Sequence, residues 1–370
     1  MNKKISFYSI MPMLEDEVGH VFQYNLSIDQ AVSQIGWNFI GYVPRSTQVK
    51  DLPPNWRKNL PHDYWKKEKT LKTKLSIFFK NIPVYVKIFK KASKKNSIIF
   101  LEHFSLFHLL AILIASSLYR HNIELWLLYR YLPNKKKIGL FRSLFRWYNF
   151  FLGKNKVKLL TDSELLANEF IHIFQKKINV IPIPHAAMST QKAHEKNNSL
   201  YLWWPGGSIR KEKGINEIRK IIKELVSSQC ALVLANSAKH QFESNSTNII
   251  YIPTELSRNE YEKWMNTSDI ILLPYDPTTY SHSTSGIFVE AILAKKMPVV
   301  KNGSWLAHEL KRFNLNELII DWEKNNLLNH IRTLFHSRNT QKKLLKMHES
   351  YKAYHSLENV SKTLKSLHPF

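Results

Sequence analysis

Short apolar segments alternate with segments of helical spacing along almost the whole chain, and this alternation restricts the fold more than any other feature of the sequence. In the first half, the segments that predict strands cover residues 4–11, 39–43, 97–101, 124–128, 157–160 and 180–183. In the second half, they cover residues 200–204, 231–235, 248–252, 269–273 and 298–301. Strands that alternate with helices favour parallel sheets with helices on both faces. We therefore expect doubly wound α/β architecture in both halves.

The length of 370 residues is comfortable for two domains with separate cores. We predict an N-terminal domain over residues 1–188, a polar linker over 189–199 and a C-terminal domain over 200–340. Helical spacing continues in polar sequence, so residues 341–370 are a predicted helical tail. The longest apolar run, 104–118, is shorter than the ~20 residues that a membrane span needs and predicts a buried helix packed on a sheet.

The charge balance is unusual, with 54 Lys and Arg residues against 29 Asp and Glu residues and a formal net charge of +25. Such a surface attracts polyanions, namely nucleic acid, anionic lipid or sugar phosphates, although a compositional bias toward lysine explains the same excess. The single cysteine, Cys230, excludes an internal disulfide and a cysteine-based metal cluster. Because no secretion signal is recognised near the N-terminus, we expect a cytoplasmic protein. Separately, we expect neither a metal ion nor a cofactor.

A glycine pair, Gly206 and Gly207, follows the predicted strand 200–204, and two cations, Arg210 and Lys213, come before the next predicted helix. Glycine lets the backbone approach a ligand closely, and arginine and lysine hold phosphate groups. The residue order of a P-loop is absent. The segment therefore predicts either a phosphate-binding turn or a basic surface turn, which is common in a lysine-rich chain.

A second polar loop follows the predicted strand 269–273 and leads into a helix that opens with Thr284, Ser285 and Gly286. Backbone N–H groups and the helix dipole at such a start bind anions such as a diphosphate. Glu290 lies about one turn further on, where its carboxylate could accept hydrogen bonds from a ribose diol. The alternative is an ordinary helix cap followed by an ordinary helical carboxylate.

Together and in this order, the two segments resemble the C-terminal domain of family 4 glycosyltransferases, which have the GT-B fold of two facing Rossmann-like domains. Residues 207–214 resemble the family's G-x-x-R-x-x-K-G phosphate-binding motif. Residues 274–291 and 296–300 resemble its donor-nucleotide helix and the strand that follows. The resemblance implies a GT-B protein with a C-terminal helical tail that uses a nucleotide-diphosphate sugar. It also implies retention of anomeric configuration, for which the sequence offers no independent carboxylate pair.

The resemblance also implies roles for individual residues. The residues expected to hold the donor are Gly206, Gly207, Arg210, Lys213, Thr284, Ser285, Gly286, Ile287 and Glu290. Arg210 and Lys213 would neutralise the leaving diphosphate, and His282 stands where the family has the first of two glutamates. His103, just after a predicted strand, resembles a family histidine near the transferred sugar, although a lone histidine is more often structural. The catalytic candidates are therefore His103, His282, Arg210 and Lys213.

The acceptor side is predicted in the N-terminal domain, where Gly19 and His20 follow the first strand and Arg130 follows a later one. Arg130 either meets an anion or pairs with an acid. Residues 50–96 and 135–151 are rich in lysine, arginine and interleaved aromatic residues. Amphipathic helices of this composition suit an anionic membrane surface, and the alternative is a solvated basic face over an aromatic core.

The sequence thus predicts transfer of a sugar from a nucleotide-diphosphate sugar to a glycan or lipid-linked acceptor, in the synthesis of a surface polysaccharide or glycolipid. The protein would be cytoplasmic and peripheral on the inner face of the membrane, and nucleic acid is not an expected partner. Two alternatives stay open. One is another GT-B-type sugar-nucleotide enzyme such as an epimerase, and the other is a catalytically inactive sugar-nucleotide-binding protein, which His282 makes conceivable.

Overall fold

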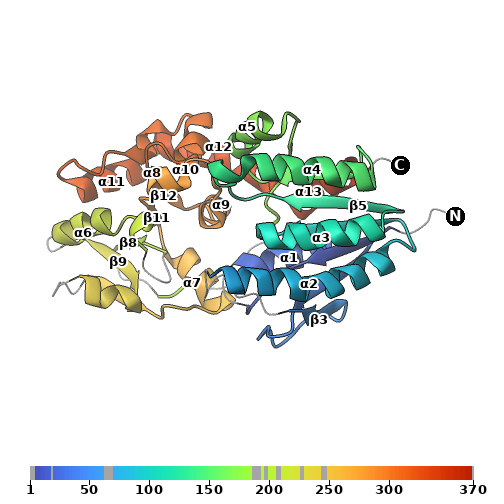
Figure 1. Ribbon diagram of the computed structural model, residues 1–370. Helices are drawn as coiled ribbons and strands as arrows, with labels where there is room; N and C mark the ends of the chain where they lie inside the picture. The colour runs from blue at the N-terminus through green and yellow to red at the C-terminus, as the bar shows by residue number, and fades with distance from the viewer. Residues whose placement is uncertain are drawn as a thin grey trace. The chain divides into compact units, whose positions relative to one another are not determined.

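Two sheets organise the chain in the computed structural model, one in each of two separate units (Figure 1). The structure describes residues 5–17, 20–61, 70–185, 193–195, 199–205, 210–225, 229–242 and 248–368. The first unit consists of Met1–Pro184 and Leu357–Phe370, and the second unit consists of His185–Ser356. Both ends of the chain therefore belong to the first unit.

The first unit contains a seven-stranded sheet in the order β3-β2-β1-β4-β5-β6-β7, in which all neighbours pair in parallel. Its strands are β1 (Ser6–Ile10), β2 (Asn38–Pro44), β3 (Trp56–Leu60), β4 (Ser97–Glu102), β5 (Ile123–Leu128), β6 (Val157–Thr161) and β7 (Asn179–Val180). Its helical segments are α1 (His20–Gln34), α2 (Leu71–Ala92), α3 (Leu106–Leu118), η1 (Lys135–Lys137), α4 (Ile138–Leu152), α5 (Glu164–Phe174) and α13 (Leu357–Leu367). The strand order reverses between β1 and β4, so a ligand crevice is expected beyond their carboxyl ends.

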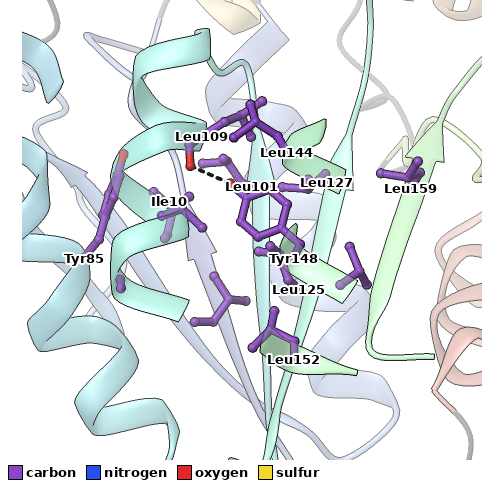
Figure 2. Close-up of a cluster of buried hydrophobic side chains, with 14 of the residues drawn as sticks. Ile10, Tyr85, Leu101, Leu109, Leu125, Leu127, Leu144, Tyr148, Leu152 and Leu159 are labelled. Carbon is purple, nitrogen blue, oxygen red and sulfur yellow. Dashed lines mark hydrogen bonds between the residues drawn. The ribbon is translucent and has the colours of Figure 1, made fainter. Parts of the chain in front are cut away.

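Helices α2, α3 and α4 pack their inward side chains onto one face of this sheet, and these side chains form a core with the strands (Figure 2). Tyr148 of α4 lies in this core, and its hydroxyl donates a hydrogen bond to the backbone carbonyl of Leu109 in α3. The bond joins two neighbouring helices through a buried polar group that would otherwise be costly. Helix α13 packs against α1, where the Ser361 hydroxyl donates to the Ala31 carbonyl at 2.9 Å.

The second unit contains a six-stranded parallel sheet in the order β10-β9-β8-β11-β12-β13. Its strands are β8 (Leu200–Trp203), β9 (Cys230–Ala235), β10 (Ile249–Ile252), β11 (Ile270–Leu273), β12 (Met297–Lys301) and β13 (Ile319–Ile320). Its helical segments are η2 (Lys211–Lys213), α6 (Ile215–Glu224), η4 (Asn236–Gln241), α7 (Arg258–Thr267), α8 (Pro277–Tyr280), α9 (Gly286–Leu293), α10 (Trp305–Arg312), η5 (Asn316–Leu318), α11 (Leu327–His336) and α12 (Arg338–Tyr354). Here the strand order reverses between β8 and β11, which pair directly.

The two parallel sheets confirm the predicted fold class, with some local differences. Strand β3 was not predicted, and its Trp56 is buried, with the ring N–H donating to Asp29 at 2.8 Å. Residues 341–370 do not form one tail, because the helix ends before Ser356 and the chain changes units there. Helix α12 packs against α9 in the second unit, whereas α13 packs in the first. Most of the predicted linker 189–199 lies outside the described residues.

The apolar run 104–118 forms α3 and packs on the sheet, as the sequence predicts. Within the described ranges, no helix combines the length and the apolar character that crossing a bilayer requires. The predicted domain limits 1–188 and 200–340 differ from the two units mainly because α12 stays with the second unit and α13 belongs to the first.

Candidate functional site

The two segments with predicted phosphate-binding character meet at the carboxyl ends of β8 and β11, where the strand order of the second unit reverses. Ligands bind at this position in doubly wound sheets. Residues 210–214 form a short turn between β8 and α6, and residues 274–285 lead from β11 to α9. The predicted donor residues Gly206 and Gly207 lie outside the described residues.

Backbone contacts hold these two segments together. The amide of Asp276 donates a hydrogen bond to the Glu212 carbonyl at 2.8 Å. Gly214 adopts a φ of +86°, and a Cβ atom there would lie 2.3 Å from the backbone oxygen of Pro274. Position 214 therefore requires glycine, both for its left-handed conformation and for the close approach of the two segments.

Lys213 is a buried cation at this junction. Its backbone carbonyl accepts a hydrogen bond from the Trp204 ring N–H at 3.1 Å, which keeps the turn against the end of β8. Burial and the nearby guanidinium of Arg210 lower the pKa of the Lys213 ammonium to about 8, although Glu212 opposes this shift. Arg210 itself is half exposed and lies 3.5 Å from the Glu212 carboxylate. An anion bound here would stabilise the buried ammonium, so the turn suits a phosphate ligand.

Tyr275 connects this turn to the N-terminus of α9. Its buried side chain forms a hydrogen bond with Ser285 and interacts electrostatically with Arg210, while burial raises its pKa. Ser285 caps α9 by accepting a hydrogen bond from the Phe288 amide at 3.3 Å. N–H groups in a first helical turn have no partner within the helix, so they can serve an anion. Thr284 precedes the capping residue, and Gly286 and Ile287 are the first two residues of the helix.

Glu290 of α9 is held by residues that the sequence analysis did not single out. Its carboxylate oxygens lie 2.8 Å from the Arg258 guanidinium and 2.6 Å from the Tyr261 hydroxyl, both on α7. The ring Nδ1 of His185 lies 3.8 Å from the same carboxylate. Burial alone would raise the pKa of Glu290, but these neighbours hold it below its usual value. Glu290 is therefore an ionised carboxylate in a local network, and a ribose would have to share or replace its partners.

The two histidines among the catalytic candidates lie in different units. His282 belongs to the loop before α9, and its ring Nδ1 lies 2.8 Å from the Ser281 hydroxyl. His103 directly follows β4 in the first unit and adopts a left-handed φ of +49°. A non-glycine residue pays a conformational cost in that region, and such residues concentrate at functional sites.

Arg130 forms a buried ion-pair cluster at the carboxyl edge of the first unit's sheet. Its guanidinium lies 3.1 Å from the Glu102 carboxylate at the end of β4 and 2.6 Å from the Asp162 carboxylate after β6. The guanidinium carbon lies 4.3 Å from the ring centroid of Tyr24, and Asn25 donates a hydrogen bond to Glu102. Burial opposes the charge of Arg130, but the two carboxylates raise its pKa above the usual value. Of the two alternatives for Arg130, pairing with acids is the one found in the structure.

The other predicted acceptor-side residues are not tested by these contacts. Gly19 lies outside the described residues. His20 begins α1, but its side chain also lies outside the description. The carboxyl edge of the first sheet is therefore defined by the Arg130 cluster and by His103.

Comparison with known proteins places the fold. The sequence matches no protein-family model and no curated protein. Among solved structures, the chain is similar to OtsA, a trehalose-6-phosphate synthase, with 13% identity and a TM-score of 0.65 over 98% of each chain. It is also similar to a trehalose-6-phosphate protein from E. coli bound with UDP-2-fluoro glucose, with 10% identity and a TM-score of 0.66 over 98% of each chain. The glycotransferase of kitacinnamycin matches with 10% identity and a TM-score of 0.57 over 99% of each chain. The chain therefore has the GT-B glycosyltransferase fold, and its likeness to family 4 in particular stays a prediction.

Proposed function

We propose that this protein is a glycosyltransferase whose second unit holds a nucleotide-diphosphate sugar. The observation that carries the proposal is the junction of residues 210–214 with residues 274–285 at the carboxyl ends of β8 and β11. The junction combines two cations and a helix N-terminus at the switch point of a doubly wound sheet. The similar E. coli structure is bound with UDP-2-fluoro glucose, a nucleotide-diphosphate sugar, which supports this class of donor.

The proposed reaction breaks the bond between the anomeric carbon and a diphosphate oxygen, and the electron pair stays on the diphosphate. The acceptor hydroxyl oxygen forms the new bond to the anomeric carbon, and its proton is released. Arg210, Lys213 and the N–H groups at the start of α9 stabilise the charge that develops on the leaving group, as preorganised donors do. His282 and His103 are the candidates to contact the transferred sugar and to accept that proton.

Glu290 is the proposed partner of the donor ribose. Each carboxylate oxygen has two lone pairs, so the bonds from Arg258 and Tyr261 leave one more acceptor position on each oxygen. The ion pair with Arg258 keeps the carboxylate charged and oriented before the nucleotide arrives. This preorganisation lowers the ordering cost of nucleotide binding.

The acceptor, a glycan or a lipid-linked glycan, is assigned to the first unit. Because the Arg130 side chain is only 10% exposed and its charge is outweighed by Glu102 and Asp162, we give it a positioning role instead of direct contact with an anion. Glu102 directly precedes His103 in the chain. The Arg130 cluster therefore fixes the backbone from which His103 projects.

Isothermal titration of the full chain with uridine, guanosine, adenosine and thymidine diphosphates, followed by their sugars, tests the proposal. We expect preferred binding of one base, and a ligand at ~100 times its Kd should raise the free energy of unfolding by ~2.7 kcal/mol. Arg210→Ala and Lys213→Ala should each weaken diphosphate binding about tenfold or more, because a lost hydrogen bond to a charged group costs ~1.5–3 kcal/mol.

Lys211→Ala is the matched control, because Lys211 is an exposed lysine in the same turn that the proposal does not assign to phosphate. Its affinity should stay within about threefold of the parent protein, as expected for a screened surface charge. Equal affinities for the parent and all three variants would exclude the phosphate assignment.

A catalytically inactive sugar-nucleotide-binding protein is the second candidate. His282 favours it, because this residue stands where the resembling family has a glutamate. Slow release of nucleoside diphosphate from the preferred donor, in the absence of acceptor, distinguishes the two. Transfer is supported by such turnover, whereas tight donor binding without any release points to the inactive protein.

A further inference from the structure

Helices α2, α3 and α4 lie side by side over one face of the first unit's sheet, as Figure 1 shows. Their inward residues belong to the core in Figure 2, and their other sides face away from that core. We call these outward sides, together with η1, the basic helical face. The residues of α2, α3, η1 and α4 include no aspartate and no glutamate. Their cations are Lys72, Lys74, Lys80, Lys87, Lys90, Lys91, Lys135, Lys136, Lys137, Arg142 and Arg146.

Large apolar side chains are exposed among these cations. On α2, Leu71, Leu75 and Phe79 recur every four residues and form one outward stripe, in which Phe79 is 64% exposed. On α4, Trp147 and Phe150 are 52% and 71% exposed, and their ring centroids lie 5.9 Å apart. Each stripe lies on the opposite side of its helix from the buried core residues. Both helices therefore present apolar groups to the outside at a cost in hydration.

The helix between them, α3, has no charged residue at all. Apart from the exposed Ser117, its half-buried or exposed residues are leucine, isoleucine and phenylalanine, and its last residue, Leu118, is 62% exposed. An uncharged helix flanked by two basic aromatic helices gives the face an apolar centre with cationic borders.

We propose that the basic helical face docks on the surface of an anionic lipid bilayer. The apolar side chains would enter the boundary between headgroups and acyl chains, and the exposed lysines and Arg146 would pair with lipid phosphates, whereas Arg142 donates to the carbonyls of His172 and Ile173. Tryptophan suits this boundary, because its ring is apolar and its N–H group is polar, and the neighbouring phenylalanine rings add apolar area. The proposal goes beyond the donor site and does not depend on it.

Charge and exposed apolar side chains favour a membrane over two other partners, a second copy of this chain and a nucleic acid. A second copy of the chain would bring two faces of the same positive sign together, and protein interfaces are depleted in lysine. A nucleic acid would match the charge, but exposed aliphatic residues such as Leu71 and Leu75 would gain nothing from it. An anionic membrane matches both the charge and the apolar side chains.

The full chain, without nucleotide, should be sedimented with vesicles of phosphatidylcholine alone and of three parts phosphatidylcholine to one part phosphatidylglycerol. We expect at least tenfold stronger binding to the anionic vesicles, and loss of that difference at about 1 M salt, where the Debye length falls to ~3 Å. Binding that ignores lipid charge and salt would overturn the proposal, whatever the titration with nucleotides shows.

Two variants separate the charged and apolar contributions. Neutralising Lys135, Lys136 and Lys137 to Gln should reduce binding to anionic vesicles by about fivefold per lysine, from the usual attraction of a basic residue to such a surface. Trp147→Ser with Phe150→Ser should reduce binding to the same vesicles at least tenfold, and the parent Trp147 fluorescence should shift to the blue on binding. Circular dichroism checks that both variants fold.

A control variant changes the same kinds of residues elsewhere. Leu345 is 51% exposed on α12 of the second unit and lies between two exposed lysines, Lys342 and Lys346. Leu345→Ser with both lysines changed to Gln should bind vesicles like the parent protein. Equal losses in the control and in the variants of the face would overturn the proposal. A dimer in sedimentation equilibrium that Trp147→Ser and Phe150→Ser abolish would also overturn it and would assign the face to self-association.

Discussion

Gly214→Ala tests whether the close approach of the two donor-side segments is a real constraint. The alanine must adopt a φ of +86°, which costs about 1–2 kcal/mol in a residue with a Cβ atom. That Cβ atom would lie 2.3 Å from the Pro274 carbonyl oxygen and 2.5 Å from its Cγ atom, so backbone must move. Overpacking of this kind adds about 1–3 kcal/mol. We expect a total loss of about 2–5 kcal/mol in the free energy of unfolding, the sum of these two effects.

Gly36→Ala is the matched control for the conformational part. Gly36 has a φ of +77° at the end of α1, but a Cβ atom there would meet nothing within 4 Å. We expect a loss of only about 1–2 kcal/mol for this variant in urea unfolding followed by tryptophan fluorescence. Titration with the preferred nucleoside diphosphate adds a second measurement. Gly214→Ala should bind it at least tenfold more weakly, because the turn carries Lys213, and Gly36→Ala should bind it normally. The reasoning is refuted if Gly214→Ala is no less stable than Gly36→Ala and binds the nucleotide equally well.

Three further predictions concern charged groups. Burial lowers the pKa of Lys213 to about 8 from the ordinary lysine value of 10.5, so its charge opposes folding at neutral pH. The unfolding free energy, relative to Lys213→Met, should rise as pH increases from about 8 toward 10.5. As the pH rises past about 8, Lys213 loses its charge, so the affinity of the parent protein for nucleoside diphosphate should fall. The affinity of Lys213→Met should not change over this interval, and titration calorimetry at several pH values measures both. Glu290→Ala should weaken the binding of nucleoside diphosphate and of the donor alike. His282→Ala should leave nucleoside diphosphate binding unchanged and lower turnover. The reverse pattern would assign the ribose contact to His282 and the sugar contact to Glu290. Arg130→Met should lose about 3–5 kcal/mol in urea unfolding, because two buried carboxylates lose their cation, and neutralising the whole triad should cost less.

The fold could be predicted largely because hydrophobic periodicity is a local signal. Apolar runs bounded by polar segments are sufficient to place buried parallel strands. Strand β3 escaped because it lies at the sheet edge, where Arg57 and Lys58 are exposed and only its two ends, Trp56 and Leu60, are buried. Helix α13 was predicted as part of a single tail over residues 341–370. Helical spacing predicts which side of a helix is apolar, but it does not predict which unit that side contacts. Its buried Val360 and Leu364 pack in the first unit.

Some residues of the candidate site could be predicted from their own segment, whereas others depend on contacts between segments that are far apart in the sequence. Arg210, Lys213 and Gly214 could be singled out because their types and spacing describe a turn that suits a phosphate. Arg258 could not, because it meets Glu290 across 32 residues of sequence and nothing in its own segment points to that carboxylate. Asp162 did carry a signal, since it directly follows a strand, but a helix start explains such a residue equally well. In the structure Ser163 is the cap, and Asp162 pairs with Arg130.

The two clusters of charged residues at the switch points differ in the sign of their net charge, and this difference supports the proposed diphosphate site in the second unit. In the first unit, the cation Arg130 is paired with two carboxylates, so that cluster carries a net negative charge and repels an anion. In the second unit, Arg210 and Lys213 stand with one carboxylate, that of Glu212, and next to a helix N-terminus. That set has a net positive charge, and part of it is buried, where screening by salt is weak. A doubly wound sheet offers the same crevice in both units, and of these two clusters the one in the second unit carries the sign of charge that favours a leaving group that gains negative charge.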